Sequence, residues 1–404
     1  MIFRKSTKII SKYDKTVLIN QDSGQWIRVS NEVFCIIKLI VLKKYDLYKL
    51  ENWFDKKEDY IYIKSVFKSM LLAGILINIS DEMPTINNKI AMIEITSRCN
   101  LNCIHCGWNS KEKFDDLNTK DMINVIDKVI DWNPAEIVLS GGEPLLRQDI
   151  EVLFDRIRQR YSGCLTLSTN GTLINNSNVV SLSKFVDKFE ISMDGYDEET
   201  TSLVRGNGVF DVVVKNINLL KGYKNKNIYL SMVIGEEDNS EKIQKFNELC
   251  NLLNVKPVIR EYMKTGNEKA DNFFSKKHDY QNKKNGLVVN KVEITACSCT
   301  AGKHDILVRS NGKVFPCQRF ISDNYCMGDL IKSSSVDDII KYHKNNIKEL
   351  FKNSLKEIAC DKCSVVDFCW TCPAEVINYD KEIDSEDICN GMKAFLDEKI
   401  WGKH

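Results

Sequence analysis

Hydrophobic residues recur along the middle of the chain in two alternating patterns. Short runs rich in Val, Ile, Leu and Met are typical of buried β-strands, and longer segments with apolar residues every three or four positions are typical of amphipathic helices. The expected strands cover residues 89–96, 136–140, 164–169, 188–194, 227–234 and 255–262, and the clearest helices cover residues 119–132, 149–161, 210–223 and 240–253. This alternation predicts an α/β fold with a parallel sheet and right-handed crossovers.

The first 85 residues show a different pattern. Residues 15–20 and 25–30 flank a QDSG turn and predict a β-hairpin, and three helix-like segments follow, at residues 31–44, 46–54 and 60–76. Polar stretches at residues 78–89 and 264–286 separate this region and the later cysteine-rich region from the strand–helix repeat. The expected parts are residues 1–85, 88–270, a bridging segment 271–296, and 297–404.

Charge and hydropathy argue against a nucleic-acid-binding protein and against a membrane-spanning protein. The 404 residues contain 57 basic and 56 acidic side chains, which argues against a nucleic-acid binder with a broad basic face. The longest apolar run near the N-terminus, VFCIIKLIVL, is interrupted by Lys38 and is too short to span a bilayer. Without a signal-peptide pattern, we expect a cytoplasmic protein with no membrane partner.

Fifteen cysteines in such a chain are more typical of metal ligands than of disulfides, because the cytosol keeps thiols reduced. Three lie at residues 99–106 and nine lie between residues 297 and 389. Cys35, Cys164 and Cys250 stand alone and are interpreted as small apolar residues.

The first cysteine group, Cys99-x3-Cys103-x2-Cys106, lies directly after the first strand of the repeat. Three thiolates on a short loop can hold three irons of a cubic iron–sulfur cluster and leave the fourth iron open. Alternatively, the three cysteines can join a distant fourth ligand in a structural zinc site. The spacing alone leaves both interpretations open.

Further polar motifs follow the next strands in order, at the carboxyl ends where parallel sheets place their chemistry. In LSGGEP, after the second strand, Gly141 and Gly142 allow close approach of a ligand, and Glu143 can accept hydrogen bonds from an ammonium group. The third strand ends with STNG, which contains Ser168 and Asn170. The fourth ends with SMDG, and RGNGVF follows shortly afterwards; these contribute Ser192 and Arg205.

With these motifs in this order, residues 88–265 resemble the radical S-adenosylmethionine (SAM) enzymes, whose partial (β/α)6 TIM-like barrel carries a Cys-x3-Cys-x2-Cys cluster motif. The resemblance implies that Cys99, Cys103 and Cys106 bind a [4Fe–4S] cluster, and that SAM chelates the open iron. It also places His105 beside the adenine, GGEP at the amino group and Arg205 near the carboxylate. The implied SAM-binding residues are His105, Gly141, Gly142, Glu143, Ser168, Asn170, Ser192 and Arg205.

The C-terminal cysteines resemble the SPASM extension, which binds two auxiliary [4Fe–4S] clusters. The resemblance assigns one cluster to Cys360, Cys363, Cys369 and Cys389, and the other to Cys299, Cys317 and Cys372. Only two residues separate Cys369 from Cys372, where the family usually has three. The fourth ligand of the second cluster could be Cys326 or Cys297, or its fourth iron could stay open. A zinc ribbon is the alternative for the two Cys-x2-Cys pairs.

The N-terminal 85 residues resemble the winged-helix-like recognition element of enzymes that modify ribosomally made peptides. A free sheet edge there can capture the leader of a precursor peptide as an added strand. The alternative is a domain that serves only stability or dimerisation.

Together the resemblances imply a peptide maturase with three [4Fe–4S] clusters, SAM and a low-potential electron donor such as flavodoxin or ferredoxin. The segment from Cys299 to Phe320 looks most like maturases that form thioether crosslinks from cysteine thiols. Alternative products are carbon–carbon or carbon–oxygen crosslinks, epimerised residues, or an oxidised side chain as in sulfatase maturation. A non-catalytic zinc protein that binds partners is the alternative from another class.

Overall fold

A computed structural model of the chain describes residues 1–78, 87–106, 115–223, 227–235, 240–262, 268–274, 294, 296, 299–343, 363–369, 372, 374 and 385–402. The chain divides into two compact units. One contains residues 1–86, 280–299 and 351–404, and the other contains residues 87–279 and 300–350. Among the described residues, no helix has the length and apolar character needed to cross a membrane.

The second unit is built on the predicted parallel sheet. Its six strands pair in chain order, each parallel to the next. They are β6 (Ile90–Thr96), β7 (Glu136–Gly141), β8 (Cys164–Thr169), β9 (Lys188–Ser192), β10 (Asn227–Ile234) and β11 (Lys256–Glu261). This arrangement confirms the α/β prediction and matches a partial TIM-like barrel.

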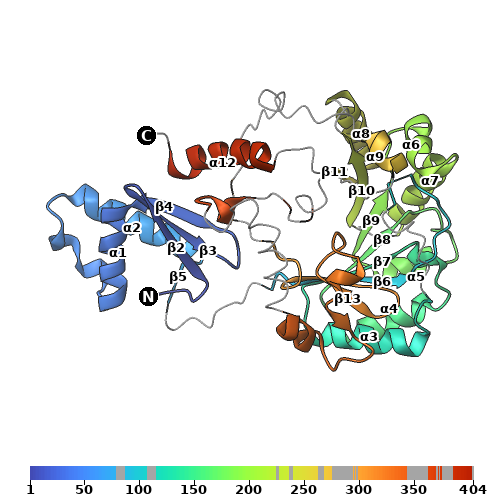
Figure 1. Cartoon of the computed structure of the whole chain (residues 1–404), viewed down its shortest axis with the longest axis horizontal. Helices are drawn as coiled ribbons and strands as arrows, with labels where there is room; N and C mark the ends of the chain where they lie inside the picture. The colour runs from blue at the N-terminus through green and yellow to red at the C-terminus, as the bar shows by residue number, and fades with distance from the viewer. Residues whose placement is uncertain are drawn as a thin grey trace. The chain divides into compact units, whose positions relative to one another are not determined.

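Helices run along the outer side of this sheet (Figure 1). They are α3 (Thr119–Asp131), α4 (Ile150–Arg160), α5 (Val179–Phe185), α6 (Glu198–Arg205), α7 (Val209–Lys221), α8 (Ser240–Leu253) and α9 (Glu268–Phe274). Alternate strand residues such as Ile93, Leu139 and Leu167 are fully buried, and so are the apolar faces of the helices. Asn118 caps α3, and Asp197 forms a capping box with Thr200 at the start of α6.

A strand from the C-terminal third extends the same sheet beyond β6. The added strand, β12 (Asp305–Val308), runs parallel to β6, and β13 (Lys313–Phe315) and β14 (Gly328–Asp329) continue the sheet antiparallel. Next to this pairing, Arg309 donates to the buried Glu94 carboxylate at 3.1 Å. The first barrel strand is therefore an internal strand of a larger sheet.

The first unit contains a three-stranded antiparallel sheet in the order β2 (Thr7–Lys12), β3 (Lys15–Asn20) and β4 (Trp26–Ser30). One face packs on α1 (Asn31–Lys43) and α2 (Lys57–Leu72), and the other packs on α12 (Ser385–Trp401) and residues 363–369. Shorter elements are β1 (Ile2–Phe3), β5 (Leu76–Ile77) and the 3-10 helices at Leu47–Lys49, Glu51–Trp53, Pro144–Leu146, Asp323–Tyr325 and Val366–Phe368.

Candidate functional site

The three clustered cysteines lie on the loop that leaves the carboxyl end of β6. Cys103 is buried, Cys106 is partly buried and Cys99 is exposed. Because the ends of parallel strands meet at one edge of a sheet, this loop faces the motifs that follow β7, β8 and β9. The sequence-predicted residues of the SAM site are thus brought to the same edge of the barrel.

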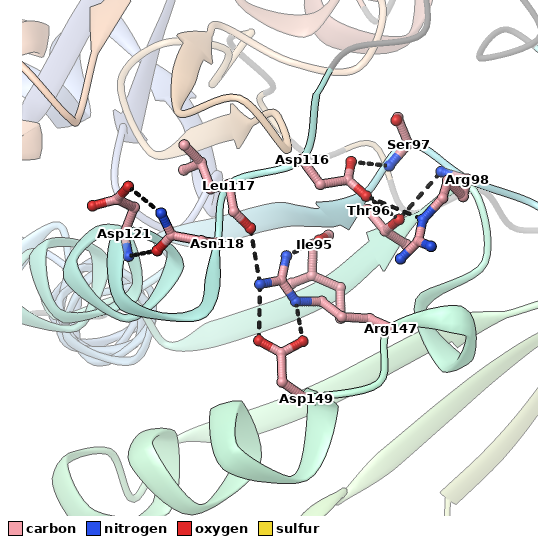
Figure 2. Close-up of polar contacts among 10 residues, drawn as sticks. All are labelled: Ile95, Thr96, Ser97, Arg98, Asp116, Leu117, Asn118, Asp121, Arg147 and Asp149. Carbon is pink, nitrogen blue, oxygen red and sulfur yellow. Dashed lines mark hydrogen bonds and ion pairs between the residues drawn. The ribbon is translucent and has the colours of Figure 1, made fainter.

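Asp116 anchors the first residues of the cysteine loop (Figure 2). Its carboxylate accepts hydrogen bonds from the Thr96 hydroxyl and from the Ser97 amide, the latter at 2.7 Å, and lies 3.5 Å from the Arg98 guanidinium. Partial burial acts to raise the pKa of Asp116, but the hydrogen bonds from Thr96 and Ser97 outweigh it and lower the pKa. The carboxylate is therefore charged at neutral pH and holds the loop where it leaves the strand.

Arg147, which directly follows the GGEPLL sequence, is a second anchor (Figure 2). Its side chain is only 5% exposed, and it donates to the Ile95 carbonyl at 2.6 Å and to the Leu117 carbonyl at 3.0 Å. It also makes a two-point contact with the Asp149 carboxylate, at 2.8 and 3.0 Å. One guanidinium thus joins the end of β6 and the segment before α3 to the start of α4.

The two glycines after β7 lie directly against the cysteine loop. The Gly142 amide donates to the Thr96 carbonyl at 2.9 Å, and the Glu143 amide donates to the Arg98 carbonyl at 2.7 Å. A Cβ atom at Gly141 or Gly142 would collide with one of these carbonyl groups, and Gly141 also has φ +149°. The sequence predicted that these glycines let a ligand approach the backbone closely. In the structure, they let the loop after β7 approach the cysteine loop closely.

Glu143 is fully buried and joins the ends of β7 and β8. Its carboxylate accepts hydrogen bonds from the Thr169 hydroxyl at 2.7 Å, the Asn170 amide at 2.8 Å and the Leu145 amide at 3.1 Å. Burial raises the pKa of Glu143, with these donors opposing the shift. Since a carboxylate has about four acceptor positions, the donors among the described residues leave one for a further donor such as a ligand ammonium group.

Asn170, which follows β8, contacts the cysteine loop directly. The Asn170 side chain donates to the Asn100 side chain at 2.9 Å and lies 3.9 Å from the Cys99 sulfur. Ser168 and Ser192 are partly buried near the ends of their strands. The His105 ring stacks on Phe274, with centroids 5.8 Å apart.

Asp194 is the central acidic residue of the site, and sequence reasoning gave it no role. It is 1% exposed, has φ +62°, and lies 2.8 Å from His105 and 2.6 Å from Arg205. Its other oxygen accepts a hydrogen bond from the Val233 amide at 2.7 Å. Burial acts to raise the pKa of Asp194, but Arg205 and His105 outweigh it and hold the pKa well below its ordinary value. The only signal in the sequence was the SMDG turn.

The chemistry of the cysteine loop fits a cluster with three thiolate ligands. Among the described residues, no three His, Cys, Asp or Glu side chains converge to hold a single metal ion. A cubane binds each thiolate through a different iron, so its ligands need not converge on one point. Burial raises the pKa of Cys103 to about 11, with Arg205 opposing, so this thiol must lose a proton when it binds iron.

The described auxiliary cysteines fall in both units. Cys317 and Cys326 belong to the barrel unit, whereas Cys299, Cys363, Cys369 and Cys372 belong to the other unit. Cys299 is exposed and the other five are partly buried. Cys297 and Cys360 lie outside the described residues, as does the side chain of Cys389. The two auxiliary ligand sets therefore remain predictions.

Two family descriptions match the sequence. Residues 93–250 match the radical SAM superfamily, and residues 297–373 match the SPASM iron–sulfur cluster-binding domain. Over 302 residues, the chain is 26% identical to the mycofactocin maturase MftC of Mycobacterium tuberculosis. The match covers 68% of this chain and 75% of that protein.

Solved structures share the fold at low identity. Streptococcus suis SuiB bound to S-adenosylmethionine is 17% identical, with a TM-score of 0.59 over 94% of this chain and 97% of SuiB. SuiB bound to the precursor peptide SuiA has a TM-score of 0.52 over 84% of this chain and 88% of SuiB. The protein anSMEcpe with bound S-adenosylmethionine is 18% identical, with a TM-score of 0.54 over 77% of this chain and 97% of the anSMEcpe chain.

Proposed function

Because this chain is an enzyme of the radical SAM superfamily with a SPASM domain, we propose that it modifies a ribosomally made precursor peptide. The observation that carries the proposal is similarity to peptide-modifying relatives beyond the barrel. The match to MftC spans 68% of this chain, and the fold of SuiB, which was crystallised with a precursor peptide, matches over 84%. Both spans exceed the radical SAM domain itself.

In the proposed site, Cys99, Cys103 and Cys106 hold a [4Fe–4S] cluster. When bound, the cluster and SAM supply a 5′-deoxyadenosyl radical, which removes a hydrogen atom from the substrate. The chain's own residues hold the cysteine loop through Asp116 and Arg147. The remaining acceptor position of Glu143 suits the SAM amino group, and Ser168, Asn170 and Ser192 line the same edge of the sheet.

The finer proposal is a thioether crosslink from a cysteine thiol of the peptide. Two auxiliary [4Fe–4S] clusters, held by the C-terminal cysteines, would bring the total to three, and flavodoxin or ferredoxin in the cytoplasm would supply electrons. Forming a C–S bond from a C–H and an S–H bond removes two hydrogen atoms: the 5′-deoxyadenosyl radical would take one, and the other would leave as a proton to the medium and an electron to a cluster. The similarity of residues 299–320 to thioether-forming maturases supports this product.

If a short cysteine-rich peptide is encoded beside this gene, its anaerobic turnover is expected to lower the peptide mass by about 2 Da per crosslink, the mass of the two hydrogen atoms removed. Tandem mass spectrometry with thiol alkylation identifies the bond, because a crosslinked cysteine no longer reacts. An unchanged mass with altered stereochemistry would indicate epimerisation instead. A loss of two hydrogens with all thiols still reactive would indicate a carbon–carbon or carbon–oxygen link.

The leader of the precursor is proposed to bind at an edge of the β2–β3–β4 sheet. Among the described residues, β2 and β4 each pair only with β3. The hydrogen bonds Gln21 amide to Ser6 carbonyl and Asn20 amide to Gln25 carbonyl fix the alternation of bonded pairs along the sheet. By this alternation, the amides of Ile9 in β2 and Arg28 in β4 point away from β3, where an added strand would pair.

A proline at the leader-binding edge is expected to weaken binding of a fluorescently labelled precursor by tenfold or more, because it removes an outward amide and obstructs an added strand. The variants are Ile9→Pro for the β2 edge and Arg28→Pro for the β4 edge. Ile9→Thr is the matched control for β2, since it keeps the amide and a strand-forming side chain. Wild-type affinity in both proline variants would contradict leader binding at this sheet.

A further inference from the structure

The side chain of Arg205 contacts a proposed cluster ligand, Cys103. Its Nη1 lies 3.8 Å from the Cys103 sulfur, within the range of an N–H···S hydrogen bond. The side chain comes from the last residue of α6 and is 9% exposed. A buried cation beside a thiolate affects the energy of any charge placed on the group that the thiolate binds.

Asp194 already neutralises this guanidinium. Nη2 of Arg205 lies 2.6 Å from the Asp194 carboxylate, which the Val233 amide and His105 hold from two further directions. The sequence resemblance implied that Arg205 pairs with the SAM carboxylate. In the structure, the guanidinium pairs with the carboxylate of Asp194. The buried Nε of Arg205 has no hydrogen-bond partner among the described residues, so one N–H remains for a group bound in the site.

We propose that Arg205 sets the reduction potential of the cluster on the cysteine loop, by donating to the Cys103 sulfur, and that Asp194 positions Arg205 and limits its positive charge. Reduction adds one negative charge to the cluster. A nearby N–H donor and cation stabilise the reduced form and raise the potential, whereas the Asp194 carboxylate opposes this effect. The inference rests on the proposed cluster site, and it does not depend on the identity of the substrate.

Substitutions of Arg205 and Asp194 are expected to shift the reduction potential in opposite directions, which a purely structural role would not predict. In Arg205→Gln the charge is lost, so the potential is expected to fall. In Asp194→Asn the guanidinium keeps its charge without the carboxylate, so the potential is expected to rise. Each shift is expected to change the ratio of reduced to oxidised cluster about tenfold at a fixed potential, which is about 59 mV for a one-electron couple. Arg205→Lys keeps the charge and is expected to lie nearer to the wild type than Arg205→Gln.

The test is an anaerobic redox titration of the full-length holoenzyme, followed by electron paramagnetic resonance. The signal that changes when SAM is added reports the cluster with the open iron, and iron analysis confirms that each variant retains its clusters. Arg156→Gln is the matched control, because it also breaks an Arg–Asp ion pair, with Asp127, on α4 outside the site.

Opposite shifts in Arg205→Gln and Asp194→Asn support the proposal. Equal potentials in these variants and the wild type would overturn it, and so would shifts in the same direction. If Arg205→Gln weakens SAM binding tenfold and leaves the potential unchanged, Arg205 contacts the SAM carboxylate instead. A wild-type protein without any SAM-sensitive signal would overturn both the cluster site and this inference, so the two failures are distinguishable.

Discussion

Replacing Cys103 by alanine is expected to abolish formation of 5′-deoxyadenosine from SAM under dithionite, to below the detection limit. Cys103 is the buried member of the cysteine loop, and a cubane with an open iron has no spare thiolate ligand to lose. Alanine at Cys99 or Cys106 is expected to have the same effect. The measurement is chromatography of the nucleoside product, which requires no peptide substrate.

Iron content distinguishes loss of this cluster from general misfolding. Each of these variants is expected to lose about four irons per chain and to keep the iron bound by the C-terminal cysteines. Cys250→Ala is the matched control, since this buried thiol lies on α8 and is isolated in the sequence; it is expected to retain both iron and activity. Wild-type protein that contains zinc and no iron would refute the cluster assignment and favour a zinc-binding interaction protein.

Arg147→Met is expected to destabilise the barrel unit by about 1–3 kcal/mol, the usual cost of leaving hydrogen-bonding groups of the folded protein without their partner. The substitution leaves the Asp149 carboxylate and the carbonyls of Ile95 and Leu117 without this donor. For a unit of this size the loss corresponds to roughly 2–12 °C in the midpoint of thermal unfolding, measured by circular dichroism.

Arg156→Met is the control for a surface arginine. Arg156 is 36% exposed and pairs with Asp127, so its loss is expected to leave the midpoint of thermal unfolding close to that of the wild type. A midpoint for Arg147→Met that matches this control would show that the Arg147 contacts do not stabilise the barrel.

The sequence predicted the barrel strands well because each is a dense apolar run. The predicted and observed bounds of β7, β8 and β10 agree within one residue. β2 was missed because its sequence, TKIISK, has few apolar residues, and its place in the sheet depends on pairing with β3. The helix predicted at residues 46–54 is two 3-10 helices, Leu47–Lys49 and Glu51–Trp53. Leu47 in the first helix and Leu50 between the two helices, three positions apart, are both buried.

The site was predictable where residue types indicate chemistry and unpredictable where roles depend on folding. The cysteine spacing and the strand-end motifs predicted which loops gather at one edge. Asp116, Arg147 and Asp194 were not identified, because each acts on partners that the sequence does not connect to it. Asp194 and Arg205, for example, belong to a strand-end turn and a later helix, and only the folded backbone makes them an ion pair.

The parallel pairing of β6 with β12 has a consequence for the newly made protein. β12 is synthesised about two hundred residues after β6, a delay of roughly 10–40 s at ordinary rates of translation. Until then, one edge of β6, next to the emerging cysteine loop, is open to pairing with other chains. The sheet can therefore gain β12 only after the start of the cysteine-rich region has been synthesised, and insertion of iron into the cysteine loop before then would meet an unfinished barrel.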